Sequence, residues 1–174
     1  MGKITPARPV KLITGFIFKD KKAFVKARGI LIKHFGNIDF ESRMMPFTLT
    51  DYYREEFGSG LKRVFISFRK LIQPQQIAAV KILTNKIEKR LTCANKRTVN
   101  LDPGYLDTAK LVLASTKDYV HRIYLGKGIY AEITLFYQAK TFSPWQWTYP
   151  DYRTGDYIGI FNHIREIYTG QVKK

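Results

Sequence analysis

Apolar residues recur with two different periods along the first hundred positions, and the periods distinguish strands from helices. Runs rich in β-branched and aromatic residues predict four strands, at 10–18, 38–47, 61–72 and 97–101. Apolar residues spaced three or four positions apart predict two long helices, one capped by Asp20 and one begun by Pro74. A short helix is also expected over 48–58, with Thr50 as its N-cap. The order β-α-β-β-α-β is that of a ferredoxin-like plait.

The second half of the chain predicts an extension of this plait. A strand at 110–116 precedes a hairpin over 119–137 that closes around Gly126 and Gly128, and a helix is expected at 156–168. We therefore expect an α+β fold, a ferredoxin-like βαββαβ plait extended by a C-terminal β-hairpin region and a final helix. Residues 1–174 are expected to form a single domain whose ends, 1–9 and 171–174, are flexible.

The segment NLDPGYLD (100–107) lies between two predicted strands and contains two carboxylates. Asp102-Pro103-Gly104 is a turn signal, because proline fixes one φ angle and glycine accepts a positive φ at the next position. A turn alone explains these three residues, and we favour that interpretation. The functional alternative is that Asp102 and Asp107 meet across the turn, either as an acid–base pair or as ligands of Mg²⁺.

Further polar residues gather in the predicted hairpin. Glu132 and Arg122 are expected to face each other as a cross-strand ion pair, and a structural role for such a pair is commoner than a catalytic one. His121 is expected on the opposite face from Arg122, because side chains alternate along a strand.

Aromatic residues are concentrated in PWQWTYPDYR (144–153). Such rings can stack on nucleic-acid bases, with Arg153 on a phosphate, or they can fasten a long loop to the body of the protein. An open sheet face carrying Arg63 and Phe65 would resemble the surface of an RNA-recognition module, although no RNP-like octapeptide is present.

The charge balance changes the range of partners. Thirty Lys and Arg against fourteen Asp and Glu give a formal net charge of +16, which favours polyanionic partners unless the lysines are merely solvated. The single cysteine, Cys93, allows no intrachain disulfide and no thiolate-rich metal site. No signal-peptide pattern or bilayer-length apolar run is present, so we expect a cytoplasmic protein without a membrane partner.

Several common chemistries are excluded by their motifs. The chain contains no P-loop, no dinucleotide-binding fingerprint and no HExxH, and its three histidines fall on separate elements. The segment TNKIE (84–88) is similar to the guanine-reading Asn-Lys-x-Asp motif, but Glu88 replaces the aspartate and the segment lies in a helix. We therefore expect Asn85 and Lys86 on the solvated face of that helix, and no zinc, haem or dinucleotide.

Taken together, the segments FGNIDFES, MPFTLTDYY, VNLDPGYL, HRIYLGKGIYAEITL and WTYPDYR resemble a bacterial family known as domain of unknown function 4416. The resemblance covers nearly the whole chain and implies a single intracellular domain of this length. It implies no established function. Some members carry a GTP-binding label, which the missing P-loop and the altered TNKIE segment do not support.

Two hypotheses from different classes follow. The first is an enzyme or binding protein for a phosphorylated small molecule or nucleotide, acting through a polar pocket in the C-terminal half. Its candidate catalytic residues are Asp102, Asp107 and Glu132. Its candidate ligand-binding residues are Asn100, Tyr105, Lys117, His121, Arg122, Asp151 and Arg153. The second hypothesis is a basic RNA-binding module without catalysis, which requires a continuous positive face with exposed rings.

Overall fold

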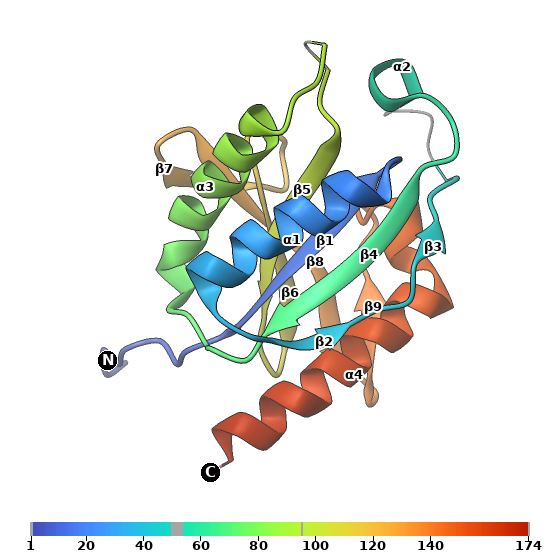
Figure 1. The fold of residues 1–174 in the computed structure, drawn as a ribbon. Helices are drawn as coiled ribbons and strands as arrows, with labels where there is room; N and C mark the ends of the chain where they lie inside the picture. Colours follow the sequence, from blue (N-terminus) through green and yellow to red (C-terminus); the bar gives the residue numbers. More distant parts are fainter. Residues whose placement is uncertain (1, 50–53, 95, 174) are drawn as a thin grey trace.

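The computed structural model describes residues 2–49, 54–94 and 96–173, and their strands form one nine-stranded antiparallel sheet (Figure 1). The strands are β1 (Lys11–Phe18), β2 (Ile38–Glu41), β3 (Met45–Pro46), β4 (Lys62–Phe68), β5 (Val99–Leu106), β6 (Lys110–Ser115), β7 (Ile123–Gly126), β8 (Ile129–Gln138) and β9 (Thr141–Pro144). Their order is β2-β4-β1-β5-β6-β8-β7, with β3 paired to β4 and β9 paired to β8. The fold is therefore α+β, as expected.

Two long helices, α1 (Lys21–Phe35) and α3 (Ile77–Arg90), cover one face of the sheet (Figure 1). The Asp20 carboxylate caps α1 by accepting the N–H of Lys22 at 2.8 Å, and Gly36 ends the helix with a φ of 85°. The apolar stripes of both helices pack on the face of β4 that carries Val64, Ile66 and Phe68. The predicted helices and the predicted alternation of β4 are confirmed.

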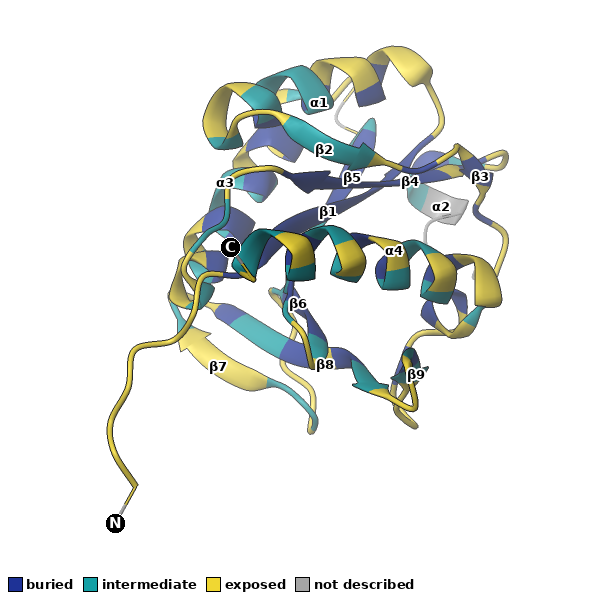
Figure 2. Ribbon diagram, turned by 90° about the horizontal axis from the view of Figure 1, so that it is seen from below, coloured by how far each residue is buried: buried dark blue, intermediate teal, exposed yellow. Residues whose placement is uncertain are grey.

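The opposite face is covered by α4 (Gly155–Val172), so that the central strands lie between helices (Figure 2). Phe161 of α4 is fully buried and packs against Phe65 of β4, with ring centroids 5.0 Å apart. Arg63 and Phe65, which an RNA-recognition surface would present on an open sheet face, are 2% and 0% exposed. That face is not open, because α4 covers it.

The prediction of a turn at Asp102–Gly104 is wrong. These residues lie inside β5, which pairs with β1 along its whole length, from Val99 opposite Phe18 to Leu106 opposite Lys11. The chain reverses after β5, where the Asp107 carboxylate accepts the N–H groups of Ala109 and Lys110 at 2.7 and 2.9 Å.

The strand tolerates Pro103 because β6 does not pair with this part of β5. The pairing of β5 with β6 extends from Leu106 opposite Leu111 only to Gly104 opposite Leu113. Beyond that point β6 remains paired with β8, whereas β5 and β6 diverge. We call the gap between β5 and β6 the β5–β6 fork, which is bounded by residues 99–103 of β5 and 114–115 of β6. Backbone polar groups alternate in direction along a strand, so Pro103 faces the fork, where its missing N–H leaves no donor unpaired.

Side chains of α3 bind the backbone that the fork leaves without a partner strand. The Leu101 N–H donates to Oε1 of Glu88 at 2.6 Å, and the Leu101 carbonyl accepts from Nζ of Lys81 at 3.0 Å. At the apex of the fork, a Cβ on Gly104 would lie 2.4 Å from the Val112 carbonyl oxygen. Glycine at 104 is therefore required by a close approach of two strands and not by a turn.

The remaining expectations have mixed outcomes. The hairpin closes around Gly126 and Gly128, both with positive φ, and the final helix is present. The strand predicted over 38–47 is instead two short strands, β2 and β3, with Ser42 between them. The short helix is α2 (Arg54–Phe57), and its predicted cap, Thr50, lies outside the described residues. No helix in the described part of the chain has the length and apolar character needed to cross a membrane.

Candidate functional site

A cavity of about 490 Å³ lies in the β5–β6 fork and is within the size range of small-molecule sites. We call it the fork cavity. Its walls come from α3, β4, β5, β6, β8 and the 3-10 turn η2 (Pro150–Arg153). The charged and amide side chains that line it are Arg63, Lys81, Asn85, Glu88, Arg97, Asn100, Asp102, Lys117, Arg122, Glu132 and Asp151.

Arg63 lies at the centre of the wall between two carboxylates. Its Nη1 donates to Oδ2 of Asp102 at 2.9 Å, and its Nη2 donates to Oδ2 of Asp151 at 3.0 Å. The guanidinium also lies over the Phe65 ring, 4.9 Å from the centroid. Gly15 of β1 leaves room for this arrangement, because a Cβ there would lie 3.2 Å from Nη1 of Arg63.

The two carboxylates have pKa values displaced in opposite directions. Burial raises the pKa of Asp102, but the charges of Arg63 and Lys81 outweigh burial, and the pKa is lowered overall. Burial raises the pKa of Asp151, and Arg63 offsets only part of that rise. One carboxyl is therefore favoured as the anion while its neighbour holds its proton to a higher pH.

A second group of charges connects α3 with β5. Arg97 donates through Nη1 to Oε2 of Glu88 at 3.0 Å and to Oδ1 of Asn100 at 3.1 Å. Asn100 in turn donates to Oδ1 of Asp102 at 2.8 Å. Burial raises the pKa of Glu88 despite the opposing charges of Lys81 and Arg97. A continuous polar chain thus runs along the cavity wall from Glu88 to Asp151.

The third group contains the predicted ion pair of the hairpin. Oε2 of the buried Glu132 accepts from Nε of Arg122 at 2.8 Å and lies 3.1 Å from Nε2 of His121. Arg122 also donates to the Tyr149 hydroxyl at 2.7 Å. These contacts neutralise Glu132 and hold Arg122 at the cavity wall.

Six of the ten sequence-predicted site residues line the fork cavity: Asn100, Asp102, Lys117, Arg122, Glu132 and Asp151. His121 contacts Glu132 without lining the cavity, and Tyr105 packs against the apolar core between the sheet and the helices α1 and α3. Arg153 does not line it either. That guanidinium donates to the carbonyls of Thr148 at 2.7 Å and Gln146 at 2.6 Å, so it fastens its own loop.

The structure does not bring Asp102 and Asp107 together. They are five positions apart in a continuous extended chain, which corresponds to about 17 Å at ~3.4 Å per residue. Both Asp107 oxygens are occupied locally, by the turn amides and by Lys110 at 3.0 Å. The alternative in which Asp102 and Asp107 meet across a turn is therefore wrong, because residues 102–104 lie inside β5. Within the described residues, no group of three or more His, Cys, Asp or Glu side chains is arranged to hold a metal ion.

Sequence reasoning missed the contribution of α3. Asn85, expected on the solvated face, is half-buried and lines the cavity together with Lys81 and Glu88. These three residues are spaced four and three positions apart, which places them on one helical face beside the apolar stripe. That spacing was the available signal. Arg97 and Tyr149 carried no comparable pattern.

The aromatic residues of the long loop stack mainly on one another. The rings of Trp145 and Trp147 are stacked with centroids 5.1 Å apart, His121 stacks on Trp147 at 5.5 Å, and Tyr119 stacks on His121 at 6.0 Å. Arg122 lies over the Tyr119 ring at 4.7 Å. The faces of the inner rings are therefore covered, which favours the interpretation that they fasten the loop.

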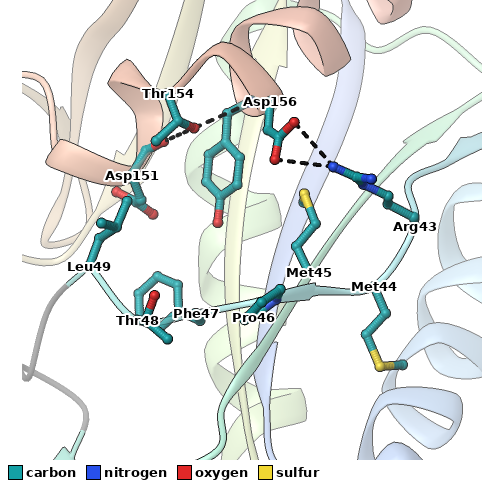
Figure 3. A pocket seen from close by; sticks show the side chains of 11 residues that line it. Arg43, Met44, Met45, Pro46, Phe47, Thr48, Leu49, Asp151, Thr154 and Asp156 are labelled. Atoms are coloured by element: carbon teal, nitrogen blue, oxygen red, sulfur yellow. Dashed lines mark hydrogen bonds and ion pairs between the residues drawn. The ribbon is translucent and has the colours of Figure 1, made fainter.

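Figure 3 shows a second cavity, of about 400 Å³, which shares three lining residues with the first. We call it the β3 cavity, because β3 and the residues that follow it form its floor. Phe47, Leu49 and Asp151 line both cavities. Asp151 therefore has access to two spaces, one on each side of this shared wall.

The family model described as "Domain of unknown function (DUF4416)" matches residues 8–168. The chain belongs to this family. The resemblance inferred from the sequence motifs is confirmed, and the match spans every residue that lines either cavity of this DUF4416 domain. No curated protein and no solved structure matches the chain.

Proposed function

We propose that the fork cavity binds a phosphorylated small molecule or nucleotide and that Asp151 and Asp102 act on it as an acid–base pair. One observation carries the proposal: two carboxylates share a single buried arginine at the wall of a ligand-sized cavity, with pKa values displaced in opposite directions. Environments that separate the pKa values of neighbouring carboxyls are typical of sites in which one group carries a proton and the other accepts one.

Lys81 supports the choice of an anionic ligand. Its ammonium group carries three donors, and within the described residues one of them is bound, by the Leu101 carbonyl at 3.0 Å. Lys117 and Arg122 line the cavity on the β6 side. A phosphoryl group in the fork would therefore contact cations from two walls, and the net charge of +16 favours the approach of an anion.

We also infer that residues 11–106 form a ferredoxin-like plait. The antiparallel order β2-β4-β1-β5, with α1 and α3 together on one face, supports this inference. A cytoplasmic location remains part of the proposal, supported by the single exposed cysteine, Cys93.

The RNA-binding alternative retains the net charge as its support. The sheet face that would resemble an RNA-binding platform is covered by α4. Of the stacked rings, His121 and Trp147 each lie between two others, so neither presents an open face. The geometry therefore favours the pocket.

A binding screen tests the proposal. Nucleotides, sugar phosphates and a short RNA are titrated calorimetrically at low and moderate salt, with and without Mg²⁺. We expect at least one small phosphorylated compound to bind with an affinity that persists as salt rises. Binding of RNA alone, with an affinity that falls steeply with salt, would contradict the proposal.

Two variants locate the binding. Lys81→Met is expected to weaken binding about tenfold or more through loss of a charge-assisted hydrogen bond, whereas Lys26→Met, at an exposed lysine of α1, is expected to leave it unchanged. Equal effects of the two substitutions would place the ligand outside the fork cavity.

A further inference from the structure

The β3 cavity differs in character from the fork cavity that it adjoins. Its walls include Met45, Pro46, Phe47 and Leu49, and Figure 3 shows Leu49 beside Asp151 with Met45 across the space from them. The apolar side chains follow one another along the chain, so a single short segment provides most of the apolar lining.

Each charged side chain that lines the β3 cavity is paired, Arg43 with Asp156 and Asp151 with Arg63 of the fork cavity. Nη2 of Arg43 donates to both carboxylate oxygens of Asp156 at 3.1 Å (Figure 3). Thr154 is occupied as well, because its hydroxyl donates to the Asp151 carbonyl at 2.8 Å and caps α4. No cation in the described lining is left for a second phosphate, and an ion would gain little there. An uncharged apolar group would gain by leaving water.

The two cavities are separated by a wall whose residues line both of them. Leu49 lines both, and 53% of its surface remains exposed, so it offers apolar surface without closing the space. Oδ2 of Asp151 binds Arg63 on the fork side, and the same residue lines the β3 cavity. A molecule with its charged end in the fork would pass Asp151 to reach the apolar lining.

We propose that the β3 cavity holds the apolar group of the ligand whose phosphoryl group occupies the fork cavity, which makes the ligand class a phosphate ester of an aliphatic or aromatic group. This inference rests on the proposed function of the fork cavity. The flexible Met45 side chain suits a lining that accommodates apolar groups of different shape. The bond beside Asp151 is then the one that joins the phosphate to the apolar group.

A homologous series of phosphate esters provides the test. The dissociation constants of methyl, butyl and hexyl phosphate are measured by calorimetry on the full chain. Full burial of one methylene is worth about 0.8 kcal/mol, and half burial therefore corresponds to roughly a twofold gain per methylene. We expect hexyl phosphate to bind about 30-fold more tightly than methyl phosphate.

Two substitutions at one position serve as test and control. Pro46→Glu places a charge in the apolar lining at an exposed position, and Pro46→Ala makes the same backbone change without the charge. The hexyl-to-methyl ratio should collapse in Pro46→Glu and persist in Pro46→Ala. If circular dichroism shows that Pro46→Glu is unfolded, Thr48→Glu, at another exposed lining residue, replaces it.

The outcomes separate this inference from the proposed function. Methyl phosphate binding with no gain along the series would overturn the apolar site and leave the fork site intact. A gain unaffected by the glutamate substitutions would also overturn it, because the alkyl group would lie elsewhere. Absence of binding by every phosphate ester, while the wider screen is also negative, would overturn both.

Discussion

Arg63 is the residue on which the candidate site depends. A buried guanidinium is tolerated when its charge is neutralised, and Asp102 and Asp151 do this while binding Nη1 and Nη2. Among the described residues, the buried Nε of Arg63 has no hydrogen-bond partner. The two carboxyls bind this arginine at similar distances, so the opposite displacements of their pKa values have other causes. The charge of Lys81 also lowers the pKa of Asp102, whereas burial is the largest effect on the pKa of Asp151 and raises it.

The opposite displacements predict opposite pH effects on stability. A lowered folded-state pKa contributes stability that is complete above the ordinary carboxyl range and is lost as pH falls through the folded pKa. Asp102→Asn should therefore lower the unfolding free energy by about 1–3 kcal/mol at pH 7. Its difference from the wild type should shrink below about pH 4. Urea denaturation at several pH values measures this, and a difference independent of pH would contradict it.

Asp151→Asn is the matched comparison. A raised folded-state pKa means that the wild type loses stability as pH rises from the ordinary carboxyl value through the raised one. The amide removes that loss, so the Tm of the variant relative to the wild type should increase over this window and then level off. Differential scanning calorimetry between about pH 3.5 and pH 8, a range that covers the ordinary pKa values of carboxyls and histidine, checks the sign. A falling relative Tm would show that the pKa of Asp151 is not raised.

Gly104 is the other residue whose identity the geometry dictates. A methyl group there would overlap the Val112 carbonyl, which is backbone and cannot rotate away. Gly104→Ala should destabilise the fold by about 1–3 kcal/mol or more. Gly159→Ala, where a Cβ meets nothing within 4 Å, is the control. Equal stability of the two variants in urea denaturation would show that β6 can shift at no cost.

Among the elements, α4 and α3 have distinct roles. α4 buries the sheet face that carries Arg63, and α3 provides polar side chains for the backbone of β5. The far end of α4 is also held, because the fully buried Lys11 of β1 contacts both Asp39 and Gln171. Gln171 and Val172, expected to be flexible, belong to the helix.

Phe161→Ala tests the packing of α4. The ring is fully buried, contacts Phe65 and stacks on Tyr152, so the substitution should cost about 3–5 kcal/mol. Val25→Ala, at a valine of α1 that is 54% exposed, should cost far less. If chemical denaturation showed that Phe161→Ala lowers the unfolding free energy as little as Val25→Ala does, α4 would contribute little to the stability of the fold.

At the scale of the whole molecule, the excess of positive charge opposes compaction. Like charges within about a Debye length, ~10 Å at 0.1 M salt, repel one another in the folded state. Much of the charge inside the fork cavity is paired, so the repulsion arises mainly from exposed lysines and arginines.

Added salt should therefore stabilise the protein. We expect the Tm to rise by a few degrees between about 10 mM and 200 mM NaCl, as screening weakens the repulsion. Thermal denaturation followed by circular dichroism measures the change. A Tm that falls with salt would indicate that the ion pairs outweigh the repulsion.

Local patterns predicted most of the elements but not the site. Asp20 and Gly36 determine where α1 begins and ends, and Gly126 and Gly128 close the hairpin. Because these signals are local, the sequence was sufficient to predict both features. Pro103-Gly104 was misread because a proline inside a strand is tolerated only where a partner strand is missing, and that depends on β6. The burial of Arg63 depends on α4, and no residue near Arg63 in the sequence indicates that this helix packs there.

The pairing of β5 with β6 is a short seam that joins two leaves of one sheet, β2-β4-β1-β5 and β6-β8-β7. In the described part of the chain, three residue pairs connect β5 to β6, and Gly104 without a side chain lies at the end of that seam. Bending about the seam would change the width of the fork cavity while the ladders within each leaf stay intact. The contacts of Leu101 with Glu88 and Lys81 would resist opening, so the same α3 side chains that line the cavity also set its stiffness.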